Sequence, residues 1–262
     1  MELIDIGANL AHDGFDADRD EVLARARDAG VAAIVVTGSC LPSTRKAVAL
    51  ARSHPGFLHA TAGLHPHHAR ELDDEMLDGL RALAGEPEVV ATGEMGLDFF
   101  RDFSPRPVQE QAFQRQLEMA VAIGKPVFLH QRDAHARFLP ILRDYLPRLP
   151  PAVVHCFTGT RAEVHDYLGL GLYIGITGWI CDERRGQALR ALARDIPPDR
   201  LMIETDAPYL LPRDLRPKPA TRRNEPMHLP AVLAALAQAR GEPPAALAAV
   251  TTANARNFFR LP

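Results

Sequence analysis

The sequence has few of the features that mark secreted, membrane-spanning or disordered proteins. Its 262 residues include only three cysteines, an odd number with no CxxC spacing, which argues against a disulfide framework and for a reducing, cytoplasmic location. No run approaches the roughly 18 uncharged apolar residues that span a membrane, and the amino-terminal stretch is acidic where a signal peptide is basic. The hydrophobic fraction of 47% is too high for a disordered chain. We therefore expect one ordered domain over residues 1–262, with no membrane partner.

Lysine is also scarce, because only three of the 30 Lys and Arg residues are lysines. Asp and Glu number 33, so the formal net charge is −3. The overall charge therefore does not indicate a nucleic-acid-binding protein, and any such role must rest on local basic patches. No exposed apolar stripe requires a dimer, so we expect a monomer.

Short apolar runs alternate with longer amphipathic stretches over most of the chain. The apolar runs predict strands at 3–6, 31–37, 57–62, 89–93, 127–130, 152–155, 172–176 and 201–204. The amphipathic stretches predict helices near 18–29, 43–53, 72–84, 107–123, 134–145, 160–169, 184–194, 228–240 and 243–258. This alternation indicates an α/β protein with a parallel sheet. Eight strands, and no GxGxxG turn after the first, favour a closed (β/α)₈ TIM-like barrel over an open doubly wound sheet.

Polar side chains stand at the carboxyl ends of several predicted strands, where barrel enzymes place their active sites. These residues are His65, His67, Glu94, His130, His155, Glu204 and Asp206. Each histidine alone could be a hydrogen-bonded structural residue, and Asp206 could begin a helix. However, Glu94, His130, His155 and Asp206 occupy equivalent places in different βα units. Carboxylates and imidazoles that meet at one rim are typical of a metal site.

Residues 208–226 differ in composition from the rest, because they contain five prolines and several arginines. The prolines exclude a regular helix, so we expect a long ordered loop after the eighth strand, and loops of that length are usually functional. Arg213, Arg222 and Arg223, together with His67, are candidates for binding substrate, although any one arginine could equally be a solvated surface residue. Unpaired bases could stack on aromatic residues nearby, of which at least two should belong to the core: Phe99, Phe100, Phe103, Trp179 and Tyr209.

Seven motifs occur in one order along the chain: DIGANL, GLHPHH, GEMGLDF, FLHQRDAH, HCFTGT, YIGITGW and IETDAPYLLP. Together they resemble the TatD family of metal-dependent deoxyribonucleases over nearly the whole length. The resemblance implies an amidohydrolase-like metallohydrolase barrel and a magnesium-dependent 3′-to-5′ exonuclease acting on single-stranded DNA, with RNA a further possible substrate. Most members of the wider family carry an HxH pair on the first strand, whereas this chain has Gly7 and Asn9 there. Only the neutral oxygen of Asn9 is then left as a weak ligand for a second metal.

Matched residue by residue, the resemblance implies that Glu94, His130 and His155 bind the metal, and that Asp206 is a further ligand or a catalytic acid or base. His65 would lie beside the scissile phosphate and donate to it or to the leaving group. Asp206 is the expected general base, and the two oxygens of Glu94 can bridge two cations. Mixed nitrogen and oxygen ligands suit Mn²⁺ or Zn²⁺ better than the Mg²⁺ that the family implies. The magnesium dependence and the histidine ligands would be compatible if Mg²⁺ were held loosely and arrived with the substrate.

Two other functions are compatible with the sequence. The first is a metallohydrolase that cleaves an ester or amide, such as the ester bond of aminoacyl-tRNA. A bridging carboxylated lysine is disfavoured in that case, because none of Lys46, Lys125 and Lys218 ends a predicted strand. The second is a non-catalytic nucleic-acid-binding protein, which would not need the cluster of potential metal ligands.

Overall fold

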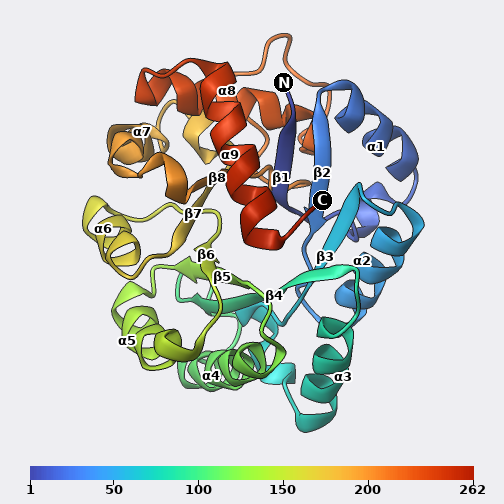
Figure 1. Ribbon diagram of the computed structural model, residues 1–262, viewed down its shortest axis with the longest axis vertical. Helices are drawn as coiled ribbons and strands as arrows, with labels where there is room; N and C mark the ends of the chain where they lie inside the picture. The colour runs from blue at the N-terminus through green and yellow to red at the C-terminus, as the bar shows by residue number, and fades with distance from the viewer.

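Eight parallel strands follow one another in sequence order in the computed structural model, which describes all 262 residues (Figure 1). They are β1 (Leu3–Ala8), β2 (Val31–Val36), β3 (Leu58–Ala62), β4 (Val89–Asp98), β5 (Val127–Arg132), β6 (Ala152–Val154), β7 (Tyr173–Ile176) and β8 (Leu201–Ile203). Backbone hydrogen bonds from Asn9 to Ala207 and from Asp206 to Gly7 join the segments that follow β1 and β8. The predicted (β/α)₈ barrel is confirmed.

Helices surround the strands (Figure 1). They are α1 (Arg19–Asp28), α2 (Leu41–Ser53), α3 (Asp74–Ala84), α4 (Arg106–Ile123), α5 (His135–Tyr145), α6 (Arg161–Gly169), α7 (Gln187–Leu192), α8 (Leu229–Arg240) and α9 (Pro244–Phe259). The prediction of one helix over 184–194 was too long. The carboxylate of Asp182 accepts the backbone N–H groups of Arg184 and Arg185, both at 2.9 Å, and this turn delays the start of α7. None of these helices combines the length and the apolar composition that a membrane-spanning helix requires.

A small apolar cluster fills the inside of the barrel, separate from the larger core between the strands and the helices. Ile4, Ile6, Phe128 and Met202 belong to the inner cluster, together with Phe258 near the end of α9. The ring of Phe258 lies 5.0 Å from that of Tyr173, the first residue of β7. Helix α9 therefore covers the amino ends of the strands. Polar groups that meet inside the barrel are accessible only from the carboxyl ends.

Asp5 is a fully buried carboxyl group that joins β1 to the segment after β8. Its Oδ1 accepts the backbone N–H of Thr205 at 2.9 Å and that of Gly7 at 3.3 Å, and its Oδ2 contacts the Thr205 hydroxyl. Burial raises the pKa of Asp5 to about 7, although these hydrogen bonds oppose the shift.

We expect Asp5→Asn to be more stable than the wild type above pH 7. The unfolded chain releases the Asp5 proton near pH 3.8 and the folded chain near pH 7, so the stability that Asp5 contributes falls as the pH rises between these values. Asparagine keeps an oxygen acceptor for the two amides and cannot ionise, and its NH₂ group donates to the Thr205 hydroxyl, which in the wild type donates to Oδ2. Melting temperatures should differ by about 3 °C or more at pH 8 and converge near pH 4. A difference that does not vary with pH would contradict this assignment.

Candidate metal centre

Glu94 lies inside β4 and His130 lies inside β5, which corrects the expectation that these strands end at Gly93 and His130. Strand β4 continues to Asp98, and its register against β5 shifts between Thr92 and Met95. Gly93 has a φ of 129°, in the region that favours glycine, and a β-carbon there would lie 2.2 Å from the carbonyl oxygen of Phe128. This glycine lets β4 pass close to β5 while the strand is irregular beside Glu94.

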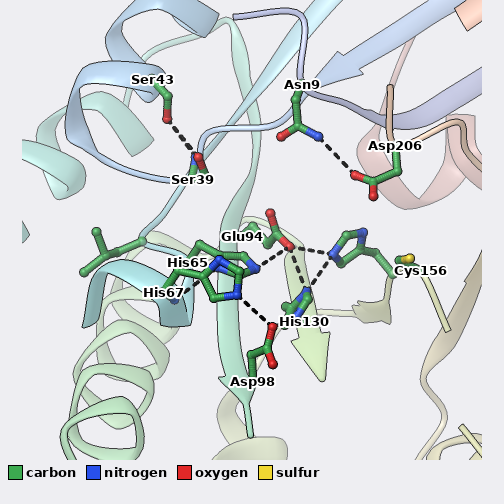
Figure 2. Close-up of polar contacts among 12 residues, drawn as sticks. Asn9, Ser39, Ser43, His65, His67, Glu94, Asp98, His130, Cys156 and Asp206 are labelled. Atoms are coloured by element: carbon green, nitrogen blue, oxygen red, sulfur yellow. Dashed lines mark hydrogen bonds and ion pairs between the residues drawn. The ribbon is translucent and has the colours of Figure 1, made fainter. Parts of the chain in front are cut away.

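Three imidazoles surround the carboxylate of Glu94, two of them labelled in Figure 2. Its Oε1 lies 2.7 Å from Nε2 of His155, 3.0 Å from Nδ1 of His130 and 3.4 Å from Nε2 of His65. The four side chains are only 4–16% exposed. The potential ligand atoms of His65, Glu94 and His130 all lie within 4.8 Å of one another. The structure thus brings together four of the residues expected at the rim.

Two further carboxylates lie beside the far ring nitrogens of His130 and His155. Asp98 Oδ2 is 3.5 Å from Nε2 of His130, and Glu204 Oε2 is 3.4 Å from Nδ1 of His155. A carboxylate that accepts a proton from the far nitrogen leaves the near nitrogen free to bind a metal. The near nitrogens, Nδ1 of His130 and Nε2 of His155, both face Glu94. One carboxylate and two such nitrogens fit a divalent cation.

His65 has the opposite arrangement of its ring nitrogens. Its Nδ1 accepts the backbone N–H of His67 at 3.1 Å. Burial, only partly opposed by Glu94, lowers the pKa of His65 well below its usual value, so the ring is neutral. A neutral ring whose Nδ1 is an acceptor carries its proton on Nε2. The His65 atom that faces Glu94 is therefore an N–H donor, which suits an anion better than a cation.

Without a metal, positive imidazolium charge compensates the buried Glu94. Burial would raise the pKa of Glu94, but the charge of His155 and the hydrogen bonds from His130 and His155 lower it well below its usual value. Burial likewise opposes the charge of His155, but Glu94 and Glu204 raise the pKa of His155 well above its usual value. A cation bound at this position would replace those protons, so metal binding should release protons.

Asp206 lies apart from the histidine cluster and pairs with Asn9 (Figure 2). Its Oδ1 accepts a hydrogen bond from Nδ2 of Asn9 at 3.0 Å. Burial raises the pKa of Asp206 to about 7, and the charges of Glu94 and Glu204 add to the shift, while His155 opposes it. A carboxyl group with this pKa suits a general base near neutral pH. Asn9 turns its amide N–H toward Asp206, so it contacts a catalytic candidate as a hydrogen-bond donor.

The structure separates the residues that were candidates for binding phosphate. Arg223 forms ion pairs with Asp18 at 2.6 Å and Glu225 at 2.9 Å, and these contacts favour a structural role over the expected contact with substrate. Arg213 and Arg222 instead line a cavity to which Arg223 does not contribute.

The remaining candidates lie on the rim or against the core. His67 is near the histidine cluster around Glu94, and its Nε2 lies 2.8 Å from Asp98. Phe100, Phe103 and Tyr209 are exposed, whereas two aromatic residues pack partly against the core, as expected: Phe99 and Trp179.

Comparison with known proteins identifies the family. The family model described as TatD related DNase matches residues 4–260. The chain belongs to the TatD family. Relatives from Cronobacter sakazakii and Erwinia billingiae, both named 3′-5′ ssDNA/RNA exonuclease TatD, are 57% and 55% identical to it over 257 and 260 residues. These matches cover 98% and 99% of this chain and 97% and 100% of the relatives. The crystal structure of a TatD homologue from Escherichia coli K12 is 30% identical, with a TM-score of 0.90 over 99% of this chain and 98% of its own.

In this TatD-family chain the sequence patterns gave no role to Asp98 and placed Glu204 only among the polar residues at the strand ends. Both are buried carboxylates that contact the candidate ligands from behind. Glycines make room for Glu204, because a β-carbon at Gly7 or Gly175 would lie 2.4 Å or 2.7 Å from its carboxylate oxygens. The carboxylate of Glu204 therefore fills the space beside Gly7 that a side chain there would need. The sequence signal for Glu204 was an acidic residue directly after a buried strand, with glycines on the two neighbouring strands that leave space for its side chain.

Proposed function

We propose that this chain is a metal-dependent 3′-5′ exonuclease that hydrolyses phosphodiester bonds in single-stranded DNA and RNA. The observation that carries the proposal is the cluster around Glu94. Nδ1 of His130 and Nε2 of His155 face it and can give up their protons to a cation, while His65 turns an N–H donor toward the same place. This combination can hold a cation and an anion side by side, as a phosphodiester hydrolase requires. The names of the two relatives support the substrate and the polarity.

Each residue has a separate task in the proposed reaction. Glu94, His130 and His155 would hold the cation, which when bound polarises the phosphate and neutralises charge on its oxygens. Asp206, held by Asn9, takes a proton from the attacking water. His65 donates its Nε2 proton in a hydrogen bond to a phosphate oxygen or to the leaving oxygen.

The positioning carboxylates complete the proposed site. Glu204 keeps His155 in the tautomer that a metal ligand needs, and Asp98, 3.5 Å from the otherwise unpartnered Nε2 of His130, would do the same for His130. Because both carboxylates are buried and lie behind the rings, they act on orientation and protonation and would not contact substrate.

An end-labelled strand would test the proposed function directly. We expect 5′-labelled single-stranded DNA and RNA to shorten one nucleotide at a time from the 3′ end when a divalent cation is present, and to stay intact in EDTA. A blunt duplex should be degraded more slowly, because its terminal bases are paired. An aminoacyl ester should survive under the same conditions. Faster cleavage of the ester would favour the alternative hydrolase, and no hydrolysis with any metal would favour a binding protein.

We propose Mg²⁺ as the physiological cation, bound weakly and together with the substrate. Two histidine nitrogens suit Mn²⁺ better than Mg²⁺, which prefers oxygen ligands and keeps its waters. We therefore expect half-maximal activity at a concentration of Mn²⁺ that is about tenfold or more below that of Mg²⁺. Calorimetric titration of the metal-free protein should show Mn²⁺ binding and little heat from Mg²⁺ until a non-hydrolysable oligonucleotide is added. Tight Mg²⁺ binding to the protein alone would contradict this.

Arg222 and Arg223 should behave differently although they are neighbours in sequence. Arg223→Ala breaks a partly buried ion-pair network, so we expect a loss of about 1–2 kcal/mol, or roughly 3–6 °C in Tm. The salt dependence of DNA binding should not change in that variant. Arg222→Ala should leave Tm unchanged and flatten the log–log salt dependence of binding by about 0.7, the value for one lost contact with single-strand phosphate. The same pattern in both variants would show that the two arginines do not have separate roles.

A further inference from the structure

A cavity of about 940 Å³ opens beside the metal centre, between the segment that follows β7 and the loop that follows β8. Its lining includes Gly178 and Trp179 from the first segment and residues 210–216 and 218–222 from the second. The hydroxyl of Thr177, next to Gly178, lies 3.7 Å from Sγ of Cys156, the neighbour of His155. The loop begins just after Asp206, and the backbone N–H of Tyr209 bonds to the carbonyl of Asp206 at 3.0 Å. The cavity therefore borders the rim on which the proposed catalytic groups lie.

The lining of this cavity is basic in a protein whose net charge is −3. Five cationic side chains face three carboxylates. Two of the carboxylates, Asp182 and Glu183, lie 3.6 Å and 3.7 Å from Arg213. The other four cationic residues form no ion pair: Arg185, Arg216, Lys218 and Arg222. Uncompensated cations that converge on one cavity indicate an anionic ligand.

Trp179 gives the same cavity an aromatic surface. The side chain packs partly against the core and is only half-buried, so the ring is held in place while part of it lines the cavity. The guanidinium of Arg185 lies 5.6 Å from the ring centroid. A fixed aromatic ring beside cations matches an unpaired nucleotide, whose base can stack while its phosphates meet the cations. A base inside a duplex has its faces covered by its neighbours and could not stack in this way.

We propose that this cavity binds the single strand beyond the nucleotides that flank the cleaved bond. One base stacks on Trp179, and the adjacent phosphates contact Arg216, Lys218 and Arg222. The inference rests on the proposed function and adds a strand-binding subsite outside the metal centre. Because the subsite does not touch the reacting phosphate, it sets KM for longer strands and leaves the chemical step unchanged.

Trp179 is the only tryptophan in the chain, so its fluorescence reports directly on this cavity. We expect an oligothymidylate of eight nucleotides to quench it in EDTA, where no hydrolysis occurs, and the Kd to rise with salt. Polyglutamate at the same charge concentration should not quench, because it has no base to stack. No quenching by the oligonucleotide, or equal quenching by polyglutamate, would overturn the subsite.

Variants separate the subsite from the catalytic centre. Arg216→Ala/Lys218→Ala should raise the Kd about tenfold or more and flatten the log–log salt dependence by about 1.4, for two lost contacts. Trp179→Ala should raise KM for the octamer by about 5-fold or more and leave kcat on bis(p-nitrophenyl) phosphate unchanged. Arg184→Ala is the matched control, because Arg184 is exposed beside Arg185 but does not line the cavity.

The two proposals fail in different ways. An unchanged Kd in the double variant, or an equal loss of activity on both substrates in Trp179→Ala, would overturn the subsite while wild-type hydrolysis persists. A wild-type protein that hydrolyses no oligonucleotide with any metal would overturn the proposed function, whatever the fluorescence shows. The binding measurement in EDTA is independent of catalysis and decides the subsite in either case.

Discussion

Replacing Glu94 with glutamine should abolish hydrolysis of single-stranded DNA and leave the barrel folded. Three histidines share the one carboxylate oxygen, so the change removes the negative charge on which a cation would be held. We expect kcat to fall by about 10³-fold or more, since the site then loses both the charge and a metal ligand. The fold should survive because the remaining imidazoles can become neutral once the carboxylate has gone, so no uncompensated charge stays buried.

Three measurements on Glu94→Gln would check this expectation. Calorimetry should show that Mn²⁺ binding is lost, circular dichroism should match that of the wild type, and activity should stay absent at saturating Mg²⁺. Glu21→Gln is a suitable control, because Glu21 is an exposed glutamate on α1, far from the cluster in the sequence. Turnover close to that of the wild type would refute a metal-centred mechanism.

The sequence was sufficient to predict that the site residues meet, for a topological reason. In a parallel barrel every strand ends at the same rim, so polar residues that follow apolar runs converge whatever their separation in the chain. Glu94, His130 and His155 satisfy this rule although 61 residues separate the first from the last. The eight strands follow from the same alternation of apolar and amphipathic segments.

The protonation of the site could not be predicted, because it depends on contacts between distant elements. The three histidines differ in the partner of the ring nitrogen that faces away from Glu94. This nitrogen lies near the carboxylate of Asp98 in His130 and near that of Glu204 in His155, whereas in His65 it accepts a backbone N–H. Residue type and spacing contain no information on which nitrogen faces inward. The same limit applies to Arg222 and Arg223.

Those two arginines are adjacent in a loop without regular secondary structure, so no periodicity assigns them to one side or the other. Arg223 is held by Asp18, which lies 205 residues earlier in the chain. Arg222 has no such partner and lines the basic cavity. The path of the loop backbone determines what each arginine contacts, and this path has no repeating pattern that could be read from the sequence.

Asp206→Asn should remove both the activity and its pH dependence. If Asp206 is the general base, kcat/KM of the wild type should rise tenfold per pH unit at acid pH and level off at or below about pH 7, where Asp206 is ionised. A cation bound in the neighbouring cluster lowers the pKa of this carboxyl, which places the inflection on the acid side of 7. Asparagine cannot accept the proton, so we expect kcat to fall by about 10²–10⁴-fold and the residual rate to be independent of pH in this range.

Two further variants assign the inflection to Asp206. The N–H of Asn9 stabilises the ionised carboxylate, so Asn9→Ala should raise the pKa of Asp206 and move the inflection to higher pH. Asp5 also has a pKa of about 7 but lies outside the proposed mechanism, so Asp5→Asn should leave the profile unchanged. An inflection that persists in Asp206→Asn, or that disappears in Asp5→Asn, would mean that another group controls the rate. If Asn9→Ala shifts the profile to lower pH instead, the hydrogen bond would favour the protonated carboxyl, and Asp206 could not act as the base in the proposed way.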